Sequence, residues 1–243
     1  MILKEFDLDI PYIADEERIK KIMEKESCQY HDATKMDYEL NWKEKRRSFR
    51  LETRCVTAMY ERLFRKMKNE DHWKIIVECV ENITRVGILN LSGVATVQVK
   101  FNYDEFHYKN ELEKKISTLN LLMEGIEKVA NNKNWPIEQF KDVSLQIEQT
   151  KYFNEWVWKK AVKNPNKNYY AEVLCQHNVN SMDISIVIKQ KNGVEIQRKK
   201  VITELPDEFA YARHLGELKW LSNFEVALIN KKGTDLVTFS LES

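Results

Sequence analysis

Two cysteine–histidine pairs are the side chains in this sequence whose types best suit a metal ion. Cys28 and His31 are separated by two residues, and Cys175 and His177 by one. Thiolate and imidazole are preferred ligands of tetrahedral zinc, so these four side chains could form one site. However, Cys175 and His177 alternate along a predicted strand, and neither pair has the turn-rich context of a zinc knuckle. We therefore predict no metal site, and interpret the second pair as a core cysteine and a surface histidine.

Nucleophilic catalysis has no signature in the chain. No serine lies in a G-x-S-x-G turn, and no cysteine lies in a recognisable protease motif. The five histidines are spread one to a region: His31, His72, His107, His177 and His214. A site assembled from dispersed residues, such as His107, Asp183 and Glu208, stays open as an alternative. The prediction is a protein that is not an enzyme.

Glycine is scarce, with six in 243 residues against an average usage of roughly 7%. Close backbone approach to a phosphate or an oxyanion commonly uses glycine, because it alone adopts positive φ without a steric penalty. No two of the six are close enough to form a nucleotide-binding loop. The sequence therefore argues against nucleotide-dependent enzymes and predicts no cofactor.

A group of acidic, aromatic and basic residues lies in the last quarter of the chain. Its members are Glu204, Asp207, Glu208, Tyr211, Arg213, Glu217 and Trp220. Clustered acids can act as acid and base or hold magnesium, but they are also common in solvated turns and first helical turns. Acids together with arginine and aromatics resemble the composition of a recognition surface. We predict that this group binds a protein partner, with Tyr211 and Trp220 as possible anchors.

Positive charge is concentrated locally but balanced overall. The chain has 39 basic and 38 acidic residues, and residues 43–54 hold six basic residues against two acidic ones. Four lysines at 159, 160, 163 and 167 form a second basic cluster. Trp42 and Phe49 could stack on bases beside the first cluster, but both belong to an apolar helical stripe. The balanced charge and this stripe argue against nucleic acid as a partner.

Helical periodicity governs the first third of the chain and part of the second. Asp15 predicts the cap of a helix ending near Ser27. Residues 38–68 predict one long helix, with apolar residues repeating every seven positions. Residues 112–130 predict another helix, and Pro136 suits the first turn of a short one. Residues 143–147 alternate as in a strand, although a helix extending to residue 151 remains open.

Strand patterns alternate with these helices and then dominate. The ranges are 74–80, 85–91, 94–103, 170–176, 183–190, 194–203, 224–229 and 236–241. Asn192-Gly193 predicts a hairpin, and 207–221 is ambiguous. The predicted class is α+β, with a helical N-terminal third, a mainly antiparallel β-sheet with packed helices, and a β-rich C-terminal third. A single composite domain over 1–243 and a subdivision into 1–163 and 168–243 both remain open.

Composition predicts a soluble cytoplasmic protein. Hydrophobic residues make up 43% and aromatic residues 11% of the chain, as in ordinary globular proteins. No run approaches the 18 or more apolar residues of a membrane span, and the charged amino terminus is not a signal peptide. The four cysteines are scattered without a Cys-x-x-Cys pair, which fits free thiols in a reducing compartment. We therefore expect no contact with a membrane.

In overall character, along its whole length, the chain resembles the immunity proteins of bacterial polymorphic-toxin systems. These are cytoplasmic, of modest size, and lack catalytic signatures. The resemblance implies a protein that binds a cognate bacterial toxin domain, such as a nuclease, and occludes its active site. An acidic surface would complement the basic groove of a nuclease. An accessory or anti-defence binding protein of a mobile element is the alternative binder.

Overall fold

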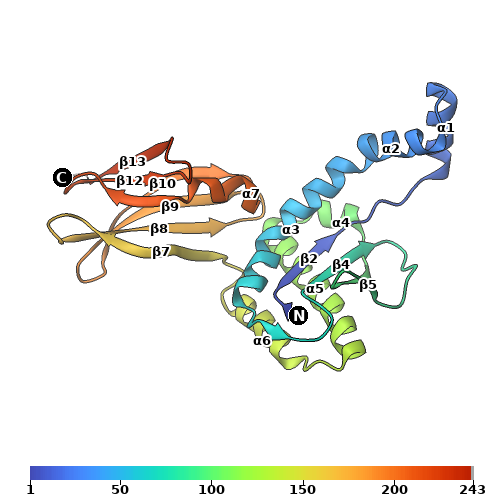
Figure 1. Cartoon of the computed structure of the whole chain (residues 1–243), viewed down its shortest axis with the longest axis horizontal. Coiled ribbons are helices and arrows are strands. Elements are labelled where there is room, and N and C mark those ends of the chain that lie inside the picture. The colour runs from blue at the N-terminus through green and yellow to red at the C-terminus, as the bar shows by residue number, and fades with distance from the viewer. Residues whose placement is uncertain (242–243) are drawn as a thin grey trace. The chain divides into compact units, whose positions relative to one another are not determined.

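The computed structural model describes residues 1–241 and consists of two compact units, Met1–Tyr152 and Phe153–Ser243 (Figure 1). The expected subdivision at 163–168 falls within the hairpin of β7 (Glu155–Lys163) and β8 (Tyr169–His177). Because β7 pairs along its length with β8, it belongs to the second unit. The change from one unit to the other therefore comes before the second cluster of lysines.

The first unit contains a four-stranded sheet that the sequence patterns described incompletely. Its order is β2 (Glu5–Asp9), β4 (Lys74–Val80), β6 (Val94–Lys100) and β5 (Leu89–Leu91). The first three strands are parallel, and only β5 runs antiparallel. The predicted strand at 85–91 is thus shortened to its last three residues. The strand β2 was not predicted, and it forms one edge of the sheet.

The helices of the first unit are α1 (Glu16–Glu26), α2 (Tyr30–Asn41), α3 (Lys43–Leu63), α4 (Tyr103–His107), α5 (Glu111–Lys133) and α6 (Glu138–Gln149). The α3 and α5 helices contact each other and the strands, and α6 packs against both. Alternate residues such as Phe6, Leu8, Ile75 and Val77 are fully buried or nearly so. Period-two burial is what a sheet covered on one face requires.

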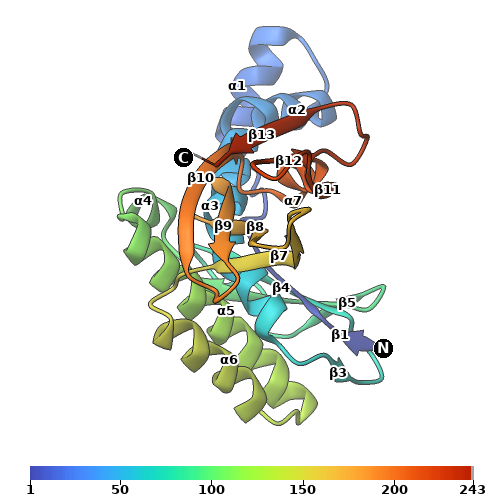
Figure 2. The same ribbon diagram turned by 90° about the vertical axis from the view of Figure 1, so that its left-hand side faces the viewer.

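A second, two-stranded sheet lies beside the amino terminus (Figure 2). It pairs β1 (Ile2–Leu3) with β3 (Met67–Lys68) in antiparallel orientation. The predicted helix over 38–68 is therefore wrong at its end, since α3 stops at Leu63. It is also interrupted at Trp42, whose φ of −124° and ψ of −35° separate α2 from α3.

The other helices show what terminal residues and periodicity can predict. Asp15 accepts a hydrogen bond from the Arg18 amide at 3.0 Å, which confirms the cap of α1, and Ser27 ends that helix in the left-handed region. The helix α5 begins with a capping box formed by Asn110 and Glu113. The alternating residues at 143–147 lie in α6, so the helical alternative was the correct one.

The second unit is made of antiparallel sheets. One has the order β10-β9-β8-β7, and the other β11-β12-β13. The remaining elements are β9 (Met182–Gln190), β10 (Glu195–Glu204), α7 (Glu208–Tyr211), a 3₁₀ turn (Ala212–His214), β11 (Glu217–Trp220), β12 (Glu225–Ile229) and β13 (Leu236–Ser240). The predicted hairpin between β9 and β10 is confirmed, with Gly193 at a φ of +87°. Together the two units confirm the α+β class.

One hydrophobic core joins the sheets of the second unit. Inward residues of β8 and β9, such as Val173 and Ile186, pack in one cluster with Val226, Leu228 and Phe239. The two sheets thus bury one shared layer of apolar side chains. Among residues 1–241, no helix has the length and apolar character that crossing a membrane demands.

The close packing of α5 on β4 yields a stability prediction. A Cβ atom added at Gly125 would lie 2.2 Å from Val77 Cγ2. We expect Gly125→Ala to lower the free energy of unfolding by about 1–3 kcal/mol, because overpacking outweighs the gain in helix propensity. Gly87→Ala is the control, since a Cβ there meets nothing within 4 Å. Urea unfolding of both variants measures the difference, and equal stability would contradict the packing argument.

The buried imidazole of His72 yields a prediction about pH. Neither ring nitrogen has a hydrogen-bond partner within the part of the chain described, and burial lowers the pKa of His72. The folded state therefore binds this proton less readily than the unfolded state, whose histidine pKa is about 6.5. His72 should therefore not make the free energy of unfolding depend on pH above that value. Below it, the free energy of unfolding should fall by up to about 1.4 kcal/mol per pH unit, because the unfolded state binds the proton more readily.

The variant His72→Phe tests this assignment, because it keeps an aromatic ring against Trp135, 5.8 Å away between ring centroids. Its free energy of unfolding should depend less on pH between 6.5 and 5 than that of the wild type. The exposed residue His31 provides the control His31→Phe, which should keep the wild-type slope. An unchanged slope in His72→Phe would assign the acid sensitivity to another group.

Candidate functional site

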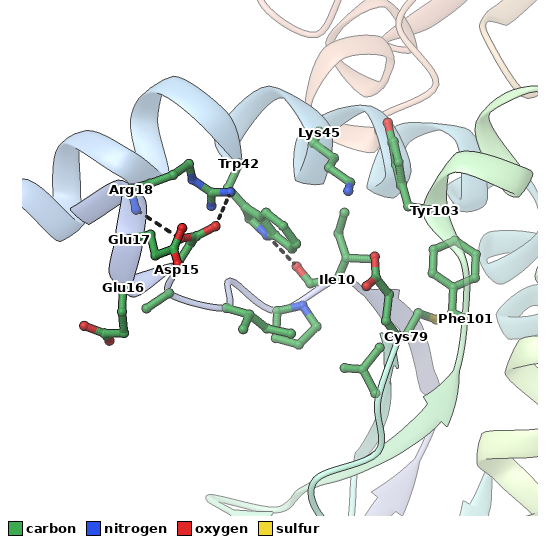
Figure 3. Close-up of a pocket in the computed structure, with 15 residues that line it drawn as sticks. Ile10, Asp15, Glu16, Glu17, Arg18, Trp42, Lys45, Cys79, Phe101 and Tyr103 are labelled. Carbon is green, nitrogen blue, oxygen red and sulfur yellow. Dashed lines mark hydrogen bonds and ion pairs between the residues drawn. The ribbon is translucent and has the colours of Figure 1, made fainter. Parts of the chain in front are cut away.

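A pocket of about 500 Å³ opens at the carboxyl ends of the parallel strands in the first unit (Figure 3). Ile10 directly follows β2, Val80 ends β4, and Phe101 directly follows β6, and all three line the pocket. Ligands of open sheets with parallel strands commonly bind outside these carboxyl ends, where loops diverge. Strand direction therefore makes this edge the first candidate for a ligand site.

Two kinds of side chain line the pocket. Apolar and aromatic ones include Ile10, Pro11, Trp42, Val80, Phe101 and Tyr103. Charged ones are Asp15, Glu16, Glu17, Arg18, Lys45 and Glu81. The lining therefore combines apolar and charged groups, and 500 Å³ falls within the usual range of small-molecule sites, about 300–1,000 Å³.

The Lys45 ammonium group lies between two aromatic rings of this pocket. Its Nζ is 4.9 Å from the centroid of Trp42 and 4.3 Å from that of Tyr103. Both distances suit cation–π attraction. The Trp42 ring is itself fixed, because its Nε1 donates to the Ile10 carbonyl at 3.2 Å (Figure 3).

A buried carboxylate holds the segment that forms one side of the pocket. Asp37 on α2 is fully buried. It accepts hydrogen bonds from Tyr12 Oη at 2.7 Å, from Asn41 Nδ2 at 2.8 Å, and from Arg18 Nε and Nη2 at 2.8 and 3.2 Å. Arg18 also pairs with Asp15 at 2.9 Å. The hydrogen bond from Arg18 is the largest cause that holds the pKa of Asp37 below its ordinary value.

The seven residues predicted to bind a partner lie in the second unit, around α7, but they differ in exposure. Tyr211 and Trp220 are only 7% and 8% exposed and belong to the hydrophobic core. Trp220 Nε1 donates to the Val162 carbonyl at 3.0 Å. These two side chains are therefore committed to the fold, and the expectation that they anchor a partner is corrected.

The charged residues of that group are partly engaged with one another. Glu204, at the end of β10, accepts a hydrogen bond from Arg213 at 2.6 Å and lies 3.2 Å from His214 Nε2. These contacts, that from His214 first, hold the pKa of Glu204 below its ordinary value. Asp207 caps α7 by accepting from the Phe209 amide at 2.7 Å. Glu208 begins α7, and Glu217 is exposed at the start of β11.

An exposed aromatic residue that the sequence argument passed over lies on α7. Phe209 is 95% exposed, and Leu205, four residues earlier in the chain, is 43% exposed. The α7 surface, as we name it, consists of Glu204, Leu205, Asp207, Glu208, Phe209 and Arg213. Phe209 and Tyr211 are two residues apart on a helix, so they project to different sides. Only the packing of Tyr211 into the core shows which of the two is exposed.

The first basic segment is largely committed to internal ion pairs. Arg46 forms a bidentate ion pair with Asp9, in which Arg46 Nε donates to Asp9 Oδ1 at 2.7 Å and Arg46 Nη2 contacts Asp9 Oδ2. Arg54 pairs with Glu61 at 2.8 Å. Phe49, which could have stacked on bases, is fully buried. These contacts account for positive charge along α3 without a nucleic acid.

The two cysteine–histidine pairs belong to different units. Cys175 and His177 both face the interior of the second unit, so the expected surface position of His177 is wrong. His177 Nε2 lies 3.2 Å from the Pro206 carbonyl. Among the residues that the structure describes, no three histidine, cysteine, aspartate or glutamate side chains group as ligands for a metal ion.

Comparison with models of protein families, with curated proteins and with solved structures gives no match for this chain. Function must therefore be inferred from the contacts and exposed groups described above.

The hydrogen bonds of Asp37 lead to a prediction. We expect Asp37→Asn to lower the free energy of unfolding by about 1–3 kcal/mol, because buried donors lose a charged acceptor. The lowered pKa means that this contribution is present above about pH 4 and lost as the pH falls further. Thermal or urea unfolding at neutral pH measures it.

The matched control is Asp32→Asn, an exposed aspartate in the first turn of the same helix. It should cost only a few tenths of a kcal/mol, the scale of an exposed helix-dipole interaction. If the two variants were equally stable, Asp37 would not be the residue that holds this segment.

Proposed function

We propose that the protein acts by binding a protein partner through the α7 surface. The observation that carries the proposal is the 95% exposure of Phe209 on a short helix. Aromatic residues are enriched among interface residues that dominate binding energy. Leu205, four residues earlier in the chain, is a second exposed apolar side chain, and exposed apolar groups can mark a contact surface.

The support beneath Phe209 makes it a pre-organised contact. Asp207 caps the helix from one end, and Tyr211 fixes it to the core from the other. Little backbone conformational entropy is therefore lost when a partner covers the phenyl ring. The α7 surface thus offers an apolar centre on a fixed backbone.

The charges around this apolar centre favour a partner whose contact surface is positively charged. The α7 surface carries three carboxylates, those of Glu204, Asp207 and Glu208, and one arginine, Arg213. Since Glu204 is already paired with Arg213, the remaining attraction is modest and lies at the rim. Rim charges mainly affect the association rate and its dependence on salt.

The partner we propose is a cognate bacterial toxin domain, following the resemblance to immunity proteins. A toxin that acts on nucleic acid has a basic substrate groove, which an acidic rim complements. Covering that groove would block substrate access without any chemistry by this chain. The protein would then neutralise its partner by occlusion.

The variant Phe209→Ala tests the proposal. Its fold should be unaffected, because the ring is almost entirely exposed. We expect affinity for the partner to fall at least about 30-fold, the loss typical of a dominant interface residue. The partner is first isolated from native lysate with the wild-type protein and identified by mass spectrometry, and its affinity is then measured by calorimetry.

The control is Phe224→Ala, which removes another exposed phenyl ring, 62% exposed, from the same unit. It should bind like the wild type. Expression of the isolated partner should arrest growth, and co-expression of the wild-type protein should restore it, whereas Phe209→Ala should not. Equal binding by Phe209→Ala and the wild type, or a partner without toxicity, would refute the corresponding part of the proposal.

A further inference from the structure

The pocket of the first unit has a chemistry that the proposed partner binding does not use. It combines an open pocket of about 500 Å³ with aromatic walls at the carboxyl edge of the parallel strands. Around it, four carboxylates face two cations, so its lining carries a net formal charge of −2. The cavity, the aromatic rings and the negative charge would all suit the same kind of ligand, a positively charged organic molecule.

The aromatic rings already hold an ammonium group. Lys45 Nζ lies within 5 Å of the centroids of both Trp42 and Tyr103. The face of an aromatic ring is electron-rich, and paired faces are how proteins recognise organic ammonium ions. Lys45 extends from the first turn of α3 on a flexible four-carbon stem. Its ammonium can therefore leave the rings while its backbone stays in place.

The carboxylates of the lining differ in whether they already form ion pairs or hydrogen bonds. Asp15 pairs with Arg18, and Glu16 accepts from the Tyr30 hydroxyl at 2.8 Å. Within residues 1–241, by contrast, neither Glu17 nor Glu81 has an ion pair or a side-chain hydrogen bond. Two carboxylates of the lining therefore remain to attract a positive ligand.

We propose that this pocket binds a small organic cation with an apolar body. The cation lies against Trp42 and Tyr103 in the place that Lys45 occupies in the free protein. Glu17 and Glu81 supply the complementary charge. The apolar body packs on Ile10 and Phe101. An anion is disfavoured, because it would gain one lysine but meet the excess of carboxylates.

Benzyltrimethylammonium is the probe, since its charge is fixed and its phenyl ring models the apolar body. Phenylpropionate, an anion of similar size, and benzyl alcohol, a neutral molecule, are the comparison probes. Calorimetric titration of the full-length protein should detect the cation at millimolar or lower concentration and neither comparison probe. The proposal is overturned if phenylpropionate binds more tightly than the cation, or if no cation binding is detected.

Variants separate the cation site from an anion site. Lys45→Met should strengthen binding of the cation about two- to fivefold, because it removes a competing ammonium from the rings. A lysine that paired with an anionic ligand would give the opposite result, with binding lost in Lys45→Met. That loss would overturn the proposal.

Two further comparisons test the walls and the rim. Tyr103→Leu should weaken binding about five- to tenfold, whereas Tyr103→Phe, which keeps the ring, should not. Glu81→Gln should weaken it about two- to fivefold, as expected for one exposed charge. Glu24→Gln removes an exposed acid on α1 that does not line the pocket, and it should bind like the wild type. Equal affinities for Tyr103→Leu, Glu81→Gln and the wild type would also overturn the proposal.

Discussion

The buried carboxylate of Asp37 is the interaction on which the geometry of the first unit's pocket depends. Removing a carboxylate from water is costly unless charged or polar donors replace the lost hydration. Here donors come from three places: Arg18 on α1, Tyr12 in the loop after β2, and Asn41 at the end of α2. One buried charge thus ties a loop to two helices. The loop carries Ile10 and Pro11 into the pocket wall, so the pocket's shape follows from this network.

The near-equal numbers of basic and acidic residues acquire a structural meaning. Arg46 with Asp9 and Lys114 with Glu52 join segments far apart in sequence, and Arg54 pairs with Glu61 two turns along the same face of α3. Basic side chains that looked like a positive surface in the sequence therefore form ion pairs within the fold. Among the described residues, the pocket carboxylates of Glu17 and Glu81 have no such ion pair, and they lie in a lining whose formal charge is −2. A local excess of one sign can exist in a chain whose total charge is close to zero.

Sequence patterns identified most elements but misjudged those whose environment is set by distant segments. The Asn192-Gly193 hairpin and the cap at Asp15 were predictable because their signals are local. The strand β2 was missed because its acids alternate with Phe6 and Leu8 near a chain end, where the pattern resembles a charged terminus. The alternation at 143–147 indicated a strand, yet it lies in α6, because five residues are too few to separate the two periods.

The candidate surfaces show the same limit more sharply. Composition directed attention to the segment around α7, but it could not tell the exposed aromatic residue from the buried ones. Tyr211 and Trp220 are covered by β-strands whose pairing no local pattern specifies, whereas Phe209 projects from the same helix as Tyr211. The pocket was beyond prediction for a related reason. Its wall comes from segments after β2, β4 and β6, and β2 itself was not recognised as a strand.

The interruption of the helix at Trp42 connects fold to pocket. The apolar repeat that includes Trp42 and Phe49 predicts a continuous helix, and backbone hydrogen bonds do continue on both sides: Trp42 N donates to Tyr38 O, and Arg46 N to Trp42 O. Yet the Trp42 backbone departs from helical geometry, and its indole donates to the Ile10 carbonyl. The ring is thereby held at the end of β2, facing the pocket and the Lys45 ammonium. A residue that looked like part of a buried stripe instead forms a wall where a ligand can reach it.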